Sequence, residues 1–489
     1  MAITLGTFGS GLDIESIVKA LVDADIAPKT NSLDRRETGL KAELSAVGSL
    51  KSVLSDLDKS LADLGDGSAF DLLSIDTPAA VDILQTGSPS VGQYSIEVDS
   101  LAASQVLATQ GFTSSSTVVG SGTLSISVGT PTYANGASSG NYTGFSAASG
   151  KTATITLDSS NNTVSGIRDA VNAAKIGITA SLVVDGSQTR LLFTADDTGA
   201  ATAISITSSD AALAQLTHGY SSGAFSSSLT EARTPADASF KLNGLSLTNA
   251  SNNITGLVDG LDFTLKKTTT SAESILIAKD TAGIEAKVKG FVDSYNTYQT
   301  TLSSLMDYQD AAGALSGDST ARRVQSAIRA QTTGVVALAG NAFTALSDLG
   351  VTSDQNGQLS LKSSDFQAAL SQNADDLKTF FAGTTTISGL SDNTDATGLA
   401  DLLKTSIDTY INSSTGMLIS RENRIDAAID DIADDRLDVV ARMQSLEERY
   451  TKQFTAMDTL VGQLQGTSDF LTNQMDAIKA AANREVGSK

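Results

Sequence analysis

Residues 424–478 read RIDAAIDDIADDRLDVVARMQSLEERYTKQFTAMDTLVGQLQGTSDFLTNQMDAI. Steps of four and three residues from Ile425 to Ile478 reach sixteen positions, of which twelve are apolar. This heptad spacing, kept for about seven repeats, predicts one continuous helix on the order of 80 Å long that packs along a seam. We expect its first half to pair within the chain and its second half, from Met457, to need the extreme N-terminus or another molecule. Four seam positions are polar and are expected to weaken a permanent coil: Arg436, Gln453, Thr467 and Gln474.

The first part of the chain offers an intramolecular partner for this seam. After Pro28, apolar residues recur at steps of three, four or seven until Gly65 and Gly67 end the pattern. We therefore expect a helix over 13–64, interrupted near Pro28, that pairs with the first half of the C-terminal helix. The repeating residues are Leu33, Leu40, Leu44, Val47, Leu50, Leu54, Leu57, Leu61 and Leu64.

Residues 9–28, GSGLDIESIVKALVDADIAP, hold a short apolar stripe where a secretory signal would lie. No Lys or Arg precedes Lys19, and Asp13 and Glu15 interrupt the apolar run, so the stretch does not fit a signal peptide. Its spacing predicts an amphipathic helix instead, with Ser10 and Asp13 as a capping-box-like start. Such a helix either packs on its own domain or stays exposed until a partner covers it.

From about 76 to 280 the pattern changes to short alternating strands such as YSIEVDS and TRLLFTA, with one helix at TVSGIRDAVNAA. Residues 111–234 are richest in Ser, Thr and Gly and suggest an insertion into a parent β domain. Helix returns at 281, and Asn356-Gly357 predicts a hairpin turn.

The expected fold class is α+β and multidomain, with nested β head domains on a helical coiled-coil stalk formed by the N- and C-terminal segments. The expected parts are an N-terminal leg (1–30), a stalk helix (31–75), the β head in two pieces (76–110 and 235–280), an inserted outer β head (111–234), a helical stalk domain (281–450) and a C-terminal leg (451–489).

Composition excludes several classes of function. With 33 basic and 55 acidic residues the net charge is -22, which disfavours nucleic acid and anionic membranes as partners. The chain has no Cys and one His, so a Cys/His zinc site or a cysteine nucleophile cannot form, and a Ser-His-Asp triad would depend on His218, expected in a loop. We expect no cofactor, no metal and no enzymatic activity. The longest apolar runs are too short to span a bilayer.

Several motifs, in order, resemble one family. The opening Gly-x-Gly-Leu-Asp-Ile stretch, YSIEVDSLAASQ at 94–105, and the Asn-Gly and Gly-Leu strand pair within 238–267 are followed by the Tyr-Asn helix at 291–308 and by the stretches 313–329 and 349–383. Together they resemble the flagellar filament cap proteins (FliD family) over nearly the whole chain. Residues 156–199 are similar to a small β-α-β insert found in flagellins and cap proteins.

The resemblance implies a structural role at the distal tip of the bacterial flagellar filament. A homo-oligomeric ring would retain exported flagellin and promote its folding and insertion during elongation. Further implied partners are the hook-filament junction proteins and a cytoplasmic export chaperone that covers residues from about 450. The chain would be secreted by flagellar type III export, without a cleaved signal peptide.

On this reading the helix at 13–27 is exposed and docks on a neighbouring subunit. Two sets of side chains are the candidate interfaces. The N-terminal leg would use Leu12, Ile14, Ile17, Val18 and Leu21, and the C-terminal helix would use Met457, Leu460, Leu464, Leu471, Met475 and Ile478.

Three alternatives stay open. A flagellin-like or hook-filament junction subunit would polymerise through the same helical ends. A surface adhesin would bind host glycans through the β head, although the absence of Trp disfavours sugar stacking. A glycosidase would need paired carboxylates such as those of DDIADD at 430–435, which are more simply a solvated helix face.

Overall fold

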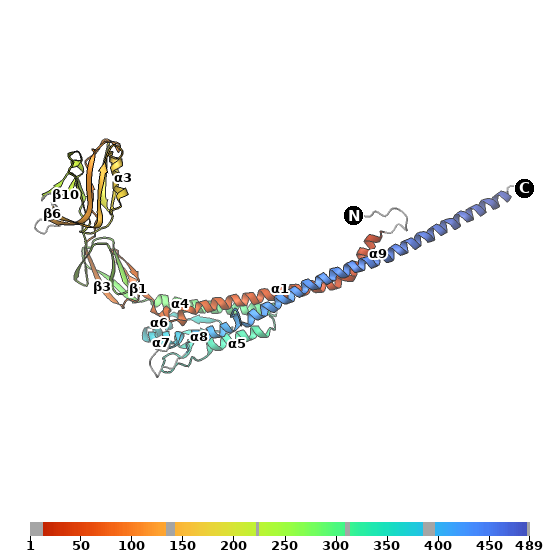
Figure 1. Cartoon of the computed structure of the whole chain (residues 1–489). Helices are drawn as coiled ribbons and strands as arrows, with labels where there is room; N and C mark the ends of the chain where they lie inside the picture. Colours follow the sequence, from red (N-terminus) through yellow and green to blue (C-terminus); the bar gives the residue numbers. More distant parts are fainter. Residues whose placement is uncertain (1–12, 134–141, 222–223, 309–312, 385–396, 487–489) are drawn as a thin grey trace. The chain divides into compact units, whose positions relative to one another are not determined.

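The computed structural model describes residues 13–133, 142–221, 224–308, 313–384 and 397–486. The chain folds as two units (Figure 1). Met1–Asp71 and Thr281–Lys489 form the first, here called the helical unit, and Leu72–Asp280 form the second, the β unit. Both ends of the chain therefore belong to the same unit.

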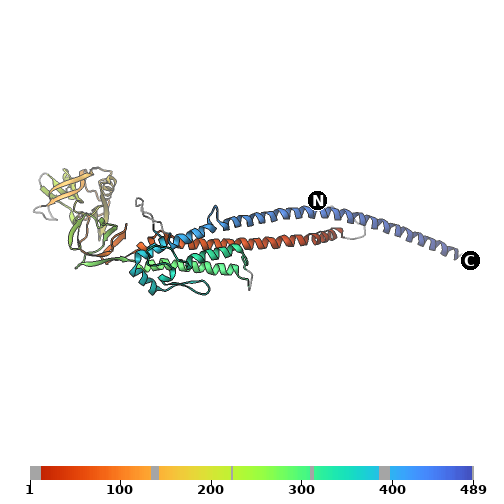
Figure 2. The ribbon, with the colours of Figure 1, turned by 90° about the horizontal axis from the view of Figure 1, so that it is seen from below.

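Two long helices, α1 (Ile14–Ser60) and α9 (Met417–Val486), lie side by side in the helical unit (Figures 1 and 2). They are antiparallel, because Lys51 late in α1 contacts Glu422 early in α9, whereas Asp25 contacts Arg442. With 70 residues, α9 is about 105 Å long. The predicted pairing of the two seams within the chain is confirmed over the first half of α9.

One expectation about the start of α1 is wrong, and the other, that Pro28 ends or bends the helix, is right only as to the bend. Asp13, not Ser10, is the N-cap, since its Oδ1 accepts a hydrogen bond from the Ser16 amide at 3.1 Å; Ser10 lies outside the described residues. The helix also continues through Pro28. Figure 1 shows its first turns at an angle to the rest, as expected where a proline lacks the N–H that would bond four residues back.

Shorter elements complete the helical unit and pack on α1, α4 and one another. They are α2 (Ala62–Gly65), η1 (Ser68–Asp71), α4 (Thr281–Met306), α5 (Ser319–Thr333), η4 (Leu346–Leu349), β18 (Val351–Ser353), β19 (Leu359–Leu361), α6 (Ser363–Gln372), α7 (Ala374–Ala382) and α8 (Leu399–Ile411). The hairpin predicted at Asn356-Gly357 is confirmed: β18 and β19 pair antiparallel, and Gly357 has φ +79°. Asn296, in the Tyr-Asn stretch of α4, holds this hairpin through the backbone of Leu359.

The β unit contains two groups of sheets with separate apolar cores. One group has the strand orders β1-β17-β3-β13-β14 and β15-β16-β2. Its strands are β1 (Leu73–Asp76), β2 (Val81–Gln85), β3 (Gly92–Ser100), β13 (Ala238–Leu242), β14 (Leu245–Asn249), β15 (Asn253–Val258), β16 (Leu261–Leu265) and β17 (Glu273–Lys279).

The other group, here called the insert, has the orders β11-β10-β9-β5-β6 and β12-β4-β8-β7. Its elements are β4 (Val106–Ala108), β5 (Gly122–Tyr133), β6 (Tyr142–Leu157), α3 (Val164–Ala174), β7 (Ile178–Asp185), β8 (Gln188–Ala195), β9 (Ala203–Thr207), η3 (Ala211–Leu216), β10 (His218–Ser221), β11 (Ala224–Ser227) and β12 (Thr230–Arg233). Strand pairing thus joins segments on either side of the insert into one sheet, through β3 and β13.

Two sequence expectations are corrected here. β4, expected before the insert, pairs with β8 and β12 and so belongs to it. His218, expected in a loop, begins β10 and is buried. Its ring packs edge-on against that of Phe225, with 5.2 Å between centroids. The predicted helix of the insert is confirmed as α3, with Thr163 as its N-cap.

Candidate assembly surfaces

The N-terminal end of α1 packs on α9 through a small apolar cluster. Val18, Val22 and Ile26 are buried together with Leu446 of α9. Partly buried side chains complete the cluster: Ile14, Val439, Met443, Tyr450 and Phe454. The two helices cover one another here because their apolar residues recur at heptad spacing on both partners.

This packing corrects the expectation of an exposed helix at 13–27. Val18 is only 2% exposed and is covered by the chain's own α9. Ile14 and Ile17 are half-buried, Leu21 is 41% exposed, and Leu12 lies outside the described residues. Sequence reasoning placed these residues on one helical face but could not show which side α9 would cover.

Ion pairs flank the apolar seam. The guanidinium of Arg436 donates from Nη2 to Asp34 Oδ1 and Glu37 Oε2 of α1, each at 2.6 Å. The bonds to Glu37 and Asp34 raise the pKa of Arg436. The pKa of Glu37 is lowered first by its hydrogen bond with Lys41 and then by the one with Arg436. α1 thus supplies two carboxylates for this polar seam position. That Arg436 weakens a permanent coil stays a prediction.

A second arginine joins three helices. Arg421 of α9 bonds Glu43 of α1 at 2.7 Å and Asp318, the N-cap residue of α5. Burial opposes the charge on Arg421, but the two carboxylates outweigh it and raise the pKa of the guanidinium. Arg421 thus fixes the start of α9 against both α1 and α5.

Past the N-terminal end of α1, the same face of α9 carries an uncovered apolar stripe. At ~100° per residue it continues the seam of Val439, Leu446 and Tyr450. Its side chains are all 44–61% exposed. We call this set the C-terminal stripe: Met457, Leu460, Leu464, Leu471, Met475 and Ile478.

Phe470, 60% exposed, was missed by the sequence reasoning. It falls outside the heptad steps and lies on a flank of α9, about 110° around the helix from the centre of the stripe at ~100° per residue. Phe470 and Leu471 are both apolar and adjacent in sequence, so the sequence alone does not show that both are exposed.

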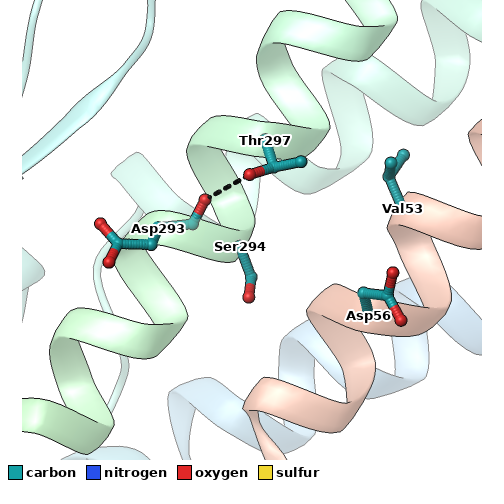
Figure 3. A pocket seen from close by; sticks show the side chains of 5 residues that line it. All are labelled: Val53, Asp56, Asp293, Ser294 and Thr297. Carbon is teal, nitrogen blue, oxygen red and sulfur yellow. Dashed lines mark hydrogen bonds between the residues drawn. The ribbon is translucent and has the colours of Figure 1, made fainter.

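The carboxylates at 430–435 do not converge on a catalytic pair. Asp430, Asp431 and Asp434 are exposed, and Asp435 lies 3.9 Å from Arg36. A hollow of about 280 Å³ lies between α1 and α4. Figure 3 shows the side chains that line it, with Thr297 Oγ1 donating to the carbonyl oxygen of Asp293. Its lining is Val53, Asp56, Asp293, Ser294 and Thr297, a set without a histidine.

Within the described ranges, no group of three or more His, Cys, Asp or Glu side chains is arranged to hold a metal ion. A search of the same residues finds no helix with the length and apolar character needed to cross a membrane.

Comparison with known proteins gives one family. A model described as the N-terminus of flagellar hook-associated protein 2 matches residues 10–105, and one described as its C-terminus matches residues 235–466. The B-type flagellar hook-associated protein 2 of Pseudomonas aeruginosa is 27% identical over 501 residues, covering 97% of this chain and 98% of that protein. The flagellar hook-associated protein 2 of Escherichia coli K12 is 27% identical over 486 residues, covering 96% and 97%.

A solved structure agrees with these relatives. The crystal structure of the D1-D2-D3 domains of the flagellar cap protein FliD from Escherichia coli has a TM-score of 0.57 and 26% identity, and it covers 78% of this chain and 99% of that one. The two family models and the relatives together span both ends and both units of the protein. This chain belongs to the flagellar hook-associated protein 2 (FliD) family.

Proposed function

We propose that this chain is the structural capping subunit at the distal tip of the bacterial flagellar filament, where it retains exported flagellin and promotes its insertion. Family membership over nearly the full length supports the role. The single structural observation that carries it is the C-terminal stripe, an apolar face of α9 left without cover by the described residues of its own chain. A capping subunit needs such a face to grip a filament end.

The mechanism is mechanical rather than covalent. The stripe would enter the filament end as a leg, with Met457 and Met475 adapting to neighbours of changing shape. Contacts of half-exposed side chains are individually weak, about 25 cal/mol per Å² of apolar surface, so a cap could exchange them as each flagellin is added. In the N-terminal leg, the exposed side of α1 near Ile17 and Leu21 would contribute, while Val18 supports the helix from within.

The finer features of this role are also proposals. Copies of the chain would form a ring at the tip and contact flagellin and the hook-filament junction proteins. An export chaperone would cover α9 from about residue 450 in the cytoplasm, because an uncovered apolar helix face promotes aggregation. The protein would reach the cell exterior by flagellar type III export without a cleaved signal peptide.

The test uses a strain that lacks this protein and is complemented with variants. Leu464→Asp with Leu471→Asp places charges in the stripe, and Thr459→Asp with Asn473→Asp places them on the opposite side of α9. All four positions are exposed, so both double variants should melt like the wild type. We expect the stripe variant to release flagellin monomer into the medium and the control to restore filaments.

Two results would contradict the proposal at different levels. Normal filaments with the stripe variant would remove the stripe from the mechanism. Filaments of normal length in the strain that lacks the protein altogether would overturn the capping function itself.

A further inference from the structure

Strand β7 presents an open edge in the insert. It lies at the end of the order β12-β4-β8-β7, and within the described residues β8 is the strand with which it pairs. Its sequence, ITASLVVD, contains no Lys, Pro or Gly before its final Asp185. Natural proteins usually protect such edges with Lys or other charged side chains, with Pro or with bulges.

The strand β6, also at the end of a sheet, illustrates the contrast. β6 carries Lys151 and the left-handed Gly150, with φ +73°. A charged side chain and a positive-φ glycine both disfavour pairing with another strand. β7 has neither protection before its final residue, Asp185.

The first half of the β7 edge is closed by a side chain. Asn172 of α3 donates from Nδ2 to the Ala180 carbonyl at 2.9 Å and accepts from the Ala180 amide at 2.7 Å. The backbone of Ala180 therefore points away from β8. Because strand residues alternate, the N–H and C=O groups of Leu182 and Val184 point the same way, and no side chain in the described part of the chain caps them.

The side chains along this open part favour strand pairing. Val183 is 45% exposed and Val184 is 71% exposed, and both are β-branched residues that favour strands. Leu182 is half-buried against the core of the insert. Asp185 is paired with Arg190 of β8 at 3.2 Å, so the end of the edge carries no unbalanced charge despite the acidic chain.

We propose that β7 is an edge-pairing site whose partner is β7 of a second copy of this chain. The open part is bounded by the Asn172 cap on one side and by the turn at Gly186 on the other, and it is centred on Val183. A two-fold antiparallel pair about Val183 matches Leu182 of one copy with Val184 of the other, and the reverse. The outward backbone groups of these residues then satisfy one another.

This register also suits the side chains. Val183 meets Val183 of the second copy, and Asp185 falls opposite the uncharged Ser181, so the two carboxylates are kept apart. The ladder is short, and the contact is therefore expected to be weak and reversible. The inference concerns the β unit and does not depend on the capping function.

The absence of cysteine from the chain permits a direct test on the full-length protein. Directly opposed residues in the non-hydrogen-bonded position of an antiparallel pair have Cα atoms about 4.5 Å apart, within the range of a disulfide. Val183→Cys should therefore form a disulfide-linked dimer under mild oxidation. Ser181→Cys, on the same face and also exposed, would lie roughly 14 Å from its copy at ~3.4 Å per residue and should remain monomeric on a non-reducing gel.

A second variant separates strand pairing from random collision. Val184→Pro removes an outward amide without removing a bond to β8, and edge strands tolerate proline at such positions. Val184→Pro, added to Val183→Cys, should slow disulfide cross-linking at least tenfold, while the circular dichroism spectrum of the protein stays unchanged. Equal cross-linking of Val183→Cys and Ser181→Cys, or of Val183→Cys with and without Val184→Pro, would overturn the proposal.

Discussion

Arg421 at the start of α9 donates to Glu43 in the middle of α1, with 2.7 Å between Nη2 and Oε1. The same guanidinium bonds Asp318, whose other oxygen accepts from the Ala321 amide at the N-terminus of α5. The three side chains are at most 29% exposed, so the ion pairs are largely shielded from water. The Arg421–Glu43 ion pair joins two residues that are 378 positions apart in sequence.

Replacing Arg421 should destabilise the helical unit. Arg421→Met keeps much of the apolar stem but leaves Glu43 and Asp318 without their cation, at a cost of about 2 kcal/mol. Urea unfolding followed by helical circular dichroism would measure the shift in midpoint. Lys59→Met is the matched control, since the Lys59–Asp56 pair is 72% and 62% exposed and should contribute less than about 0.5 kcal/mol. Equal shifts for both variants would contradict this role of Arg421.

The periodic parts of the fold were predictable from sequence because heptad spacing survives in any context. The α1–α9 pairing, the helix α3 and the β18–β19 hairpin each follow from local residues: apolar steps of three and four, an N-cap at Thr163, and the turn at Gly357. The N-cap of α1 and the continuity of that helix at Pro28 did not follow. A proline interior to a helix is tolerated when packing holds the turns on either side, and that packing comes from α9.

The candidate surfaces were predictable as helix faces but not in their exposure. Val18 and Leu21 have the same apolar character in sequence, yet one is buried by α9 and the other faces outward. Arg436 has the spacing of a seam residue. Its partners Asp34 and Glu37 are 402 and 399 positions away in sequence. Long-range contacts of this kind leave no local signature in a single sequence.

Asn296 should contribute to the attachment of the hairpin to α4. Its Nδ2 donates to the Leu359 carbonyl at 2.8 Å, and its Oδ1 accepts from the Leu359 amide at 2.7 Å. Asn296→Ala leaves both backbone groups without these bonds, at a cost of roughly 1–3 kcal/mol. Hydrogen exchange at 351–361 should accelerate. Gln358→Ala, which removes one exposed bond to Thr300, should change exchange little; the reverse order would exclude the role of Asn296.

His218 should make the insert sensitive to mild acid. Burial lowers its pKa from 6.5 to about 4, and its Nδ1 lies 2.8 Å from Ser227 Oγ. Between these two pH values the unfolded chain binds a proton that the folded chain does not. Stability is therefore complete above pH 6.5 and falls as the pH is lowered, by up to ~1.4 kcal/mol per pH unit and on the order of 3 kcal/mol at pH 4.

The comparison of wild type with His218→Gln isolates this effect, because carboxylates titrate alike in both. Hydrogen exchange of peptides covering β9 to β11 would report the free energy of local opening at each pH. The difference between the two proteins should change from pH 7 to pH 4, with the variant losing less protection. A difference that is constant across this range would contradict a buried neutral histidine.

The N-terminal end of α1 offers a test that separates internal packing from docking, since Val18 and Leu21 are close in sequence and differ in exposure, 2% against 41%. Val18→Asp places an unpaired charge against Leu446 and its neighbours and should cost about 3 kcal/mol of local stability. Leu21→Asp places the same charge in water and should leave the α1–α9 pairing intact. Hydrogen exchange at 14–30 and at 439–454 would then increase for Val18→Asp alone.

If the exposed side of this helix docks on the filament end, Leu21→Asp should nevertheless abolish swarming in a complemented strain. Normal swarming with Leu21→Asp would confine this segment to a structural role within its own chain.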